Sequence, residues 1–169
     1  RLATLLTQIE VDPADPAFSR AEFDRAVAGR RKQVKAVLQD QESLAGIGNA
    51  YSDEILHAAR LSPMKTVASL SDEEVARLFD ATRLTLEAWI ARLRDEAAGE
   101  FPEKVTAFRA GMAVHGRYGQ PCPDCGSPVQ RIVYARNEAN YCSRCQTGGR
   151  LLSDRALSRL LKDDWPKTL

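Results

Sequence analysis

Two helix-forming stretches of this sequence are joined by Leu44-Ala45-Gly46-Ile47-Gly48-Asn49-Ala50-Tyr51. The two glycines permit positive φ angles and let the backbone come close to whatever lies outside the turn. Asn49 is a good N-cap for a helix over residues 50–60, and the free N–H groups at that helix start form an anion site that suits a DNA phosphate. A plain helix–turn–helix corner, with Asn49 as its cap, explains the same residues, so both interpretations stand here.

The segments on either side of this turn are predicted to be helical. A capping box at residues 19–22 opens a first helix, and a second helix is expected over residues 31–39. Another capping box at residues 71–74 opens the longest helix, which should run to Ala97 because apolar side chains recur every three or four positions. The fold class is therefore mainly α, with a helical domain over residues 1–114.

Four cysteines in the last third of the chain form two identical pairs: Cys122, Cys125, Cys142 and Cys145. Two residues separate the cysteines of each pair, so one turn can present both sulfurs to the same ion, and sixteen residues separate the pairs. Four thiolates leave no open coordination position, so we predict one structural Zn²⁺. Two disulfides or an iron centre are the alternatives.

The segment between the cysteine pairs predicts a β-hairpin. Residues 129–134 are typical of a strand, and a turn at about Asn137 and Glu138 would lead into a short return strand. A final helix is expected to start at residues 153–154. These elements predict a second unit over residues 115–169, a zinc-binding β-hairpin followed by a C-terminal helix.

Composition and charge restrict the class of protein. The 169 residues are 44% hydrophobic and 28% charged, which is typical of a globular chain, and no stretch approaches the roughly 18 apolar residues of a membrane helix. The net charge of +1 divides into −3 over residues 1–114 and +4 over residues 115–169. A basic cluster at residues 30–35 is either a solvated face or a contact surface for phosphates.

Two separate motifs carry a family resemblance. Lys35 and the residues between 38 and 56 closely resemble the helix-two-turn-helix motif of the formamidopyrimidine-DNA glycosylase / endonuclease VIII family. Residues 114–122 and 141–146 are similar to the start and end of that family's zinc finger. The order and separation of the motifs also match, so the resemblance covers most of the chain from about Ser19 to Gln146.

The resemblance implies base-excision repair. Members of the family flip a damaged base out of duplex DNA, cut its glycosidic bond and nick the strand by β,δ-elimination. The family's nucleophile is the amine of an N-terminal proline, with a neighbouring glutamate as acid/base catalyst, in a β-rich N-terminal domain. This sequence starts with Arg1 and shows neither. We therefore expect no catalytic residue in this chain and interpret it as the DNA-binding portion of a bifunctional DNA glycosylase/AP lyase for oxidised bases.

The expected partner is double-stranded DNA that contains an oxidised base or an abasic site. The segment from Gly99 to Met112 is shorter than in the purine-specific branch, which leaves oxidised pyrimidines and abasic sites open as targets. A monomer without a membrane partner, in the bacterial cytoplasm and associated with the nucleoid, is expected. The alternatives are a natural, catalytically inactive DNA-binding protein and a non-enzymatic zinc-ribbon protein that binds nucleic acid or protein.

The resemblance also assigns DNA contacts. Asn49 and the Gly48 backbone should hold a phosphate next to the lesion, with Lys35 helping. An arginine at the tip of the family's finger reaches the phosphates of the flipped nucleotide, and Arg136 is the nearest candidate. Asn137 stands at the position where that arginine is expected, so the assignment of Arg136 implies a one-residue change in the hairpin.

Several other residues that could carry chemistry are given structural interpretations. His57 is expected at the surface of its helix, and His115 is not needed as a zinc ligand. Asp53 and Glu54 are adjacent, so on a helix they point in different directions and make no acid/base pair. Trp89 falls in the apolar stripe of the long helix and is expected in the core.

Overall fold

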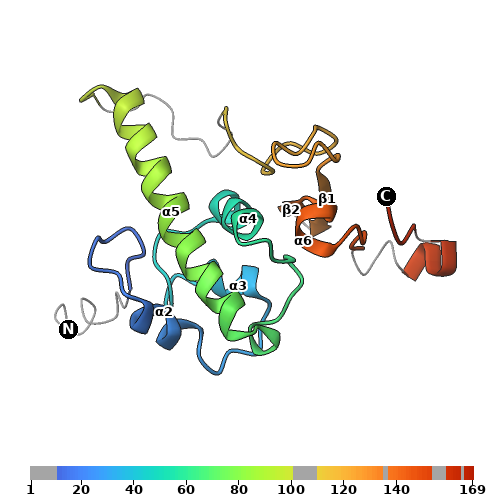
Figure 1. Cartoon of the computed structure of the whole chain (residues 1–169), viewed down its shortest axis with the longest axis horizontal. Coiled ribbons are helices and arrows are strands. Elements are labelled where there is room, and N and C mark those ends of the chain that lie inside the picture. Colours follow the sequence, from blue (N-terminus) through green and yellow to red (C-terminus); the bar gives the residue numbers. More distant parts are fainter. Residues whose placement is uncertain (1–10, 101–109, 135–136, 154–158, 165) are drawn as a thin grey trace.

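The computed structural model describes residues 11–100, 110–134, 137–153, 159–164 and 166–169. Its elements, in chain order, are α2 (Arg20–Val27), α3 (Val34–Leu38), α4 (Asn49–Ala58), η1 (Val67–Ser69), α5 (Asp72–Ala97), β1 (Gln130–Tyr134), β2 (Asn137–Tyr141), α6 (Ser143–Thr147) and η2 (Lys162–Asp164). Figure 1 shows α5 crossing the helical part, with α4 between α5 and the β-hairpin. Among the described helices, none is both long and apolar enough to cross a bilayer. The predicted mainly helical fold with a small hairpin is confirmed.

Both predicted capping boxes are present and fix the starts of α2 and α5. The Ser19 hydroxyl accepts a hydrogen bond from the Glu22 backbone, and the Glu22 carboxylate accepts one from the Ser19 backbone. Ser71 and Glu74 make the same reciprocal pair, and α5 covers the residues that its apolar periodicity predicts. The helix ends at Ala97, because the C-cap residue Ala98 has a left-handed backbone.

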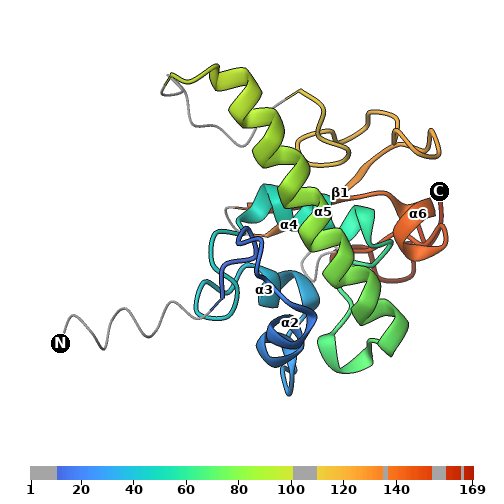
Figure 2. The ribbon, with the colours of Figure 1, turned by 60° about the vertical axis from the view of Figure 1, so that its left-hand side comes forward.

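The helical part is built around a main hydrophobic core with a smaller buried cluster beside it. The rings of Phe18, Phe23 and Phe79 pack together with centroids 5.4–6.2 Å apart. In Figure 2, α5 crosses the other helices of this part, and it packs against both α2 and α4. Trp89 is 8% exposed and lies in a second buried cluster with Ala50 and Met112, which confirms its place in the core.

The second predicted helix is shorter than expected. It covers Val34–Leu38, whereas the sequence favoured residues 31–39. The residues before α3 are extended because they pair with the segment that follows α4. Gln33 forms a β-bridge with Thr66, and the Val34 N–H donates to the Lys65 carbonyl at 2.8 Å.

The turn between α3 and α4 corrects the expectation that Asn49 is an N-cap. The helix begins at Asn49 itself, Gly48 is the N-cap residue, and no side chain makes a capping hydrogen bond there. The Asn49 amide oxygen accepts a hydrogen bond from Gln39, and the amide N–H donates to the hairpin. Of the two glycines, Gly46 takes the positive φ angle of 84°, while Gly48 is extended.

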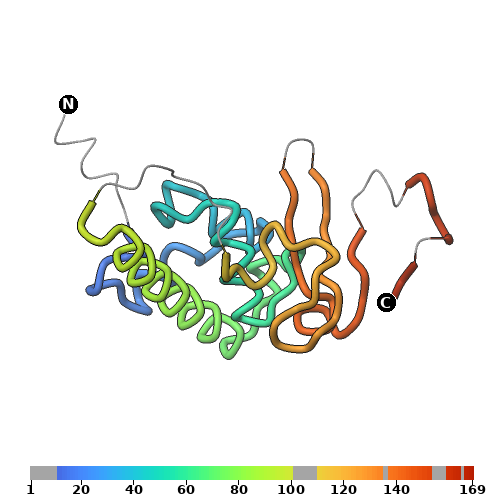
Figure 3. Tube along the Cα trace, turned by 90° about the horizontal axis from the view of Figure 1, so that it is seen from above, coloured from blue at the N-terminus to red at the C-terminus, as the bar shows by residue number. Residues whose placement is uncertain are grey.

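The predicted hairpin is present, but its turn is not where the sequence suggested. Tyr134 pairs with Asn137, so residues 135 and 136 alone separate β1 from β2, and Asn137 and Glu138 belong to the second strand. Cross-strand pairing therefore extends further than the short return strand that was expected. Figure 3 shows the two strands side by side, between the helical part and the C-terminal end. Residues 154–158 of the predicted final helix lie outside the described residues, and residues 159–161 are helical.

Candidate nucleic-acid interface and metal centre

The four cysteine sulfurs converge on one point. All four lie within 4.8 Å of one another, with 4.0 Å between Cys122 and Cys145 and 3.4 Å between Cys125 and Cys142. These separations exceed the roughly 2.05 Å of a disulfide bond. A tetrahedral zinc with Zn–S bonds of about 2.3 Å places its sulfurs about 3.8 Å apart. The geometry and the all-thiolate donor set therefore fit one structural zinc.

The surroundings of the cysteine thiols shift their pKa values in opposite directions. The Cys142 sulfur caps α6 by accepting a hydrogen bond from the Cys145 N–H at 3.5 Å. Burial alone would raise the pKa of Cys125, but hydrogen bonds from the backbone and hydroxyl of Ser127 outweigh it and lower this pKa to about 6. Burial, together with the neighbouring sulfurs, raises the pKa of Cys142 and Cys145, so metal binding has to displace protons from these two thiols.

Asp53 joins three parts of the molecule at the centre of the interface. Its side chain is fully buried, and its carboxylate forms an ion pair with Lys35 of α3. The other carboxylate oxygen lies 2.9 Å from His115 Nδ1 and accepts a hydrogen bond from the Asn140 N–H at 3.2 Å. Asp53 thus connects α3 and α4 with the start of the cysteine-bearing unit and with β2.

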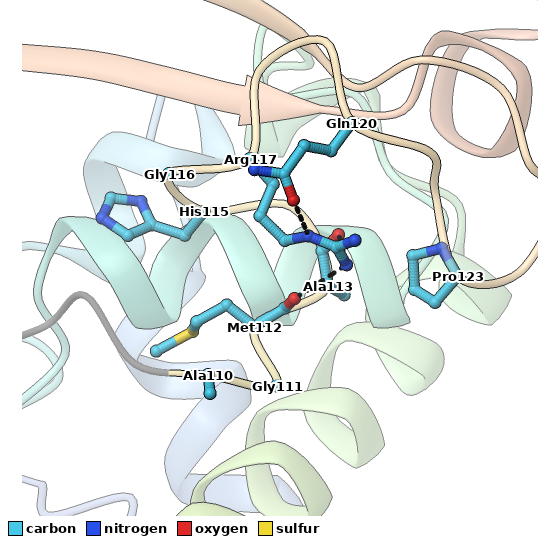
Figure 4. Close-up of a pocket in the computed structure, with 9 residues that line it drawn as sticks. All are labelled: Ala110, Gly111, Met112, Ala113, His115, Gly116, Arg117, Gln120 and Pro123. Carbon is cyan, nitrogen blue, oxygen red and sulfur yellow. Dashed lines mark hydrogen bonds between the residues drawn. The ribbon is translucent and has the colours of Figure 1, made fainter.

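Glu54 holds the chain where it enters the cysteine-bearing unit. Its carboxylate accepts hydrogen bonds from the N–H groups of Ala113, Val114 and His115 at 2.7, 2.9 and 2.9 Å. Figure 4 shows the same segment, with the Arg117 side chain folded back toward Met112 and Ala113 beside a pocket of about 570 Å³. Arg117 donates to the carbonyls of both residues, at 3.1 and 3.3 Å. The two adjacent acids are therefore clamps between α4 and the finger.

The predicted phosphate contacts gather at the start of α4. Gly48 is exposed and Asn49 is half-buried. The Asn49 amide accepts a hydrogen bond from Gln39 at 3.2 Å and donates one to the Glu138 carbonyl of β2 at 2.9 Å. The Lys35 ammonium lies 3.4 Å from the Asn49 carbonyl oxygen. Three of the four predicted contact residues thus lie together beside the hairpin.

Lys35 differs from an ordinary surface lysine, because its side chain is only 10% exposed. Burial lowers the pKa of its ammonium, and the charge and hydrogen bond of Asp53 oppose that effect. Arg136, the predicted finger arginine, lies outside the described residues.

His57 was expected at the surface, and this expectation is wrong. The residue is 4% exposed, because α4 packs its last turn directly against the cysteine cluster. His57 Nε2 lies 3.3 Å from the Cys122 sulfur and 3.7 Å from the Asp124 carboxylate. Burial lowers the pKa of this imidazole, while Asp124 opposes the shift.

Sequence spacing carried a signal for this face of α4. Asp53 and His57 are four residues apart, which places them on one side of α4, and Arg60 follows just beyond the end of the helix. Arg60 makes an ion pair with Asp124 at 2.7 Å. Polar residues at helical spacing, between a glycine turn and a cysteine module, therefore indicated the face of α4 that packs against the cysteine-bearing unit.

Two family models match separate parts of this chain. A family model described as the formamidopyrimidine-DNA glycosylase H2TH domain matches residues 9–97. A second, described as the zinc finger found in FPG and IleRS, matches residues 119–148.

Individual relatives differ in how much of their own length is matched. An uncharacterized formamidopyrimidine-DNA glycosylase-like protein of Mycobacterium tuberculosis is 43% identical over 80% of this chain and 84% of its own length. The formamidopyrimidine-DNA glycosylase of Moorella thermoacetica is 42% identical over 75% of this chain but 47% of its own length. A crystal structure of Lactococcus lactis FPG with FAPY-dG-containing DNA superposes with a TM-score of 0.71, at 26% identity, over 86% of this chain and 54% of that one. The chain thus spans about half the length of the glycosylases it matches.

Proposed function

Because this chain belongs to the formamidopyrimidine-DNA glycosylase family, we propose that it is the DNA-binding portion of a base-excision-repair enzyme. Its ligand is duplex DNA that contains an oxidised base or an abasic site. The observation that carries the proposal is the hydrogen bond between Asn49 and the Glu138 carbonyl, which joins the start of α4 to the zinc-finger hairpin. The two family motifs therefore form one continuous surface.

The chemistry of this surface suits a phosphate. The first N–H groups of a helix have no partner within the helix and carry a partial positive charge. No side chain caps α4, and the exposed Gly48 adds no side chain that would keep a phosphate away. The Lys35 ammonium, which is paired with Asp53, lies 3.4 Å from the Asn49 carbonyl oxygen and is the positive charge closest to this site in the proposal. Arg136 belongs to the proposal as a finger contact to the phosphates of the flipped nucleotide.

The proposal assigns the chemical step to a part of the enzyme outside this sequence. Glycosidic cleavage and β,δ-elimination need the family's N-terminal proline amine and glutamate, and no catalytic role is assigned to a residue of this chain. The chain binds, orients the duplex and supplies the zinc-stabilised finger. It acts as a monomer on DNA in the bacterial cytoplasm, associated with the nucleoid.

A second candidate is a DNA-binding protein that acts without a glycosylase domain. The Mycobacterium tuberculosis relative favours it, because the matched region makes up 84% of that protein. The two candidates share the same DNA surface and differ in whether a catalytic domain is joined to it.

The test is fluorescence anisotropy with the purified zinc-loaded chain and labelled duplexes that are intact or carry a tetrahydrofuran abasic analogue. We expect binding to both, with a dissociation constant of roughly 10⁻⁴ to 10⁻⁶ M for intact DNA and a steep loss of affinity with salt. Borohydride treatment with abasic-site DNA should trap no covalent adduct. Absence of DNA binding at low salt contradicts the proposal and leaves the protein-binding zinc-ribbon interpretation. A trapped adduct contradicts the assignment of catalysis to another part of the enzyme.

A further inference from the structure

The metal centre receives a contact from outside the zinc finger. Cys122 belongs to the finger, but His57, whose Nε2 lies 3.3 Å from the Cys122 sulfur, belongs to α4 of the helical part. The two residues are 65 positions apart. Both are almost completely buried, with 4% exposure for His57 and 2% for Cys122. The contact is therefore shielded from water, which strengthens a hydrogen bond.

The chemistry of the two side chains decides which one donates the hydrogen bond. A zinc-bound cysteine is a thiolate, which can only accept a hydrogen bond. An imidazole that carries a proton on Nε2 donates to it, and both the neutral Nε2–H tautomer and the cation have that proton. A centre of four thiolates and one Zn²⁺ carries a formal charge of −2, so N–H donors aimed at its sulfurs offset uncompensated negative charge.

We propose that His57 is a positioning residue of the metal centre, which donates an Nε2–H hydrogen bond to the Cys122 thiolate and so slows the loss of zinc. The bond fixes the orientation of one ligand and withdraws electron density from its sulfur. A thiolate that donates less electron density reacts more slowly with electrophiles and oxidants, and attack on a ligand thiolate is how such a centre loses its metal.

His57 links the metal centre to the helix that carries the proposed phosphate site. His57 lies in the last turn of the helix whose first residue is Asn49. One end of α4 thus touches the metal ligand, and the other end forms the proposed phosphate site. The proposal concerns zinc retention alone and stands independently of DNA binding.

The test compares His57→Phe, which keeps an aromatic ring but removes the donor, with His57→Gln, whose amide places an N–H near the position of Nε2. Zinc affinity is measured by competition with a chromogenic chelator, and the release rate is followed during reaction with N-ethylmaleimide. We expect zinc affinity about 10–100-fold weaker and faster release for His57→Phe, with His57→Gln close to the unmodified protein. His115→Gln is the control, because His115 is also buried but bonds to Asp53.

The comparison separates hydrogen bonding from packing. If His57 only fills space, His57→Phe should retain zinc at least as well as His57→Gln, and that result overturns the proposal. A second test uses the unmodified protein, so it does not depend on whether a variant folds. With ¹¹³Cd in place of zinc, NMR should detect scalar coupling between the metal and the His57 Nε2 proton across the hydrogen bond. A spectrum in which that proton is observed without coupling to the metal also overturns the proposal, and so does one in which no Nε2 proton is found.

Discussion

Asn49 and Glu138 are 89 positions apart in the chain, yet the Asn49 amide donates a 2.9 Å hydrogen bond to the Glu138 backbone carbonyl. The bond ties the first residue of α4 to the second residue of β2. Asn49 therefore holds the hairpin against the start of α4, and the proposed function gives the same amide a second role as a phosphate contact. The predictions below follow from this surface and from the buried contacts behind it.

Replacing Asn49 with Ala should weaken DNA binding. The side chain caps no helix but makes two hydrogen bonds, one from Gln39 and one to the Glu138 carbonyl, so folding loses about 1–3 kcal/mol. Loss of a hydrogen bond to a charged phosphate costs about 1.5–3 kcal/mol, or roughly tenfold to a hundredfold in Kd. Anisotropy with duplex DNA measures the effect, and Ser69→Ala, in η1, is the control. Binding of Asn49→Ala equal to that of the unmodified protein would remove the phosphate-clamp proposal.

Removing the metal should unfold the finger and leave the helical core. Elemental analysis should find one zinc per chain, because four sulfurs complete one tetrahedral shell. After chelation, residues 116–146 should lose hydrogen-exchange protection, while α5 keeps its protection because it packs in a separate core. The side of α4 that packs against the finger should lose part of its hydrogen-exchange protection, since Asp53 and Asn49 bond to β2. Full protection of the finger without metal contradicts a structural role for zinc.

Lys35→Met should destabilise the fold and reduce the salt dependence of DNA binding. The substitution leaves the fully buried Asp53 carboxylate without its cationic partner, and breaking a buried pair typically costs about 3–5 kcal/mol. If Lys35 also neutralises one phosphate, the slope of log K against log salt should fall by about one unit. Urea unfolding and anisotropy measure the two effects. Lys32→Met is the control for stability, because Lys32 is exposed and should change stability by less than about 0.5 kcal/mol. Stability of Lys35→Met equal to that of this control would show that the pair contributes nothing.

Glu54→Gln should loosen the link between α4 and the finger. The carboxylate accepts from three consecutive backbone N–H groups, whereas an amide presents one oxygen and an NH₂ group that faces a donor. Each hydrogen bond to a charged group contributes about 1.5–3 kcal/mol, so a loss of roughly 3 kcal/mol is expected. Urea unfolding measures it, with the exposed Glu42→Gln as the control. Equal stabilities of the two variants contradict the clamp.

Acid should remove the stability that Glu74 contributes. A hydrogen bond from Lys65 lowers the pKa of Glu74; burial opposes the shift, and the Ser71 backbone adds to it. A carboxyl whose pKa is lower in the folded state stabilises the fold above its unfolded pKa of about 4.5, and this contribution is lost as the pH falls through the lower folded value. Glu74→Gln should therefore destabilise the protein at pH 7, by about 1 kcal/mol or less, since the pair is only half-buried.

The measurement is the difference in unfolding free energy between the unmodified protein and Glu74→Gln from pH 7 to pH 3. This difference should shrink toward zero with acidification. Zinc release in acid is common to both proteins and cancels in the difference. A difference that is constant with pH would show that the carboxylate charge is not involved.

The sequence alone determined the elements whose signals are local. The capping boxes at Ser19 and Ser71, the periodicity of α5 and the spacing of the four cysteines predicted two helix starts, one long helix and the metal centre. Each of these depends on residues within a few turns of one another, or on a ligand spacing that few other structures explain. The resemblance that these motifs carry also predicted the family.

The tertiary structure decided how residues far apart in the chain use their polar groups. Asn49 was predicted as a helix cap, but its amide bonds to a strand 89 positions away, and His57 was predicted at the surface but contacts a cysteine ligand. A helical pattern shows which residues share a face, but it does not show which unit will cover that face. Burying a polar group without a partner costs free energy, so Asp53, Glu54 and His57 acquire their roles only when the zinc finger packs against α4 and supplies the partners.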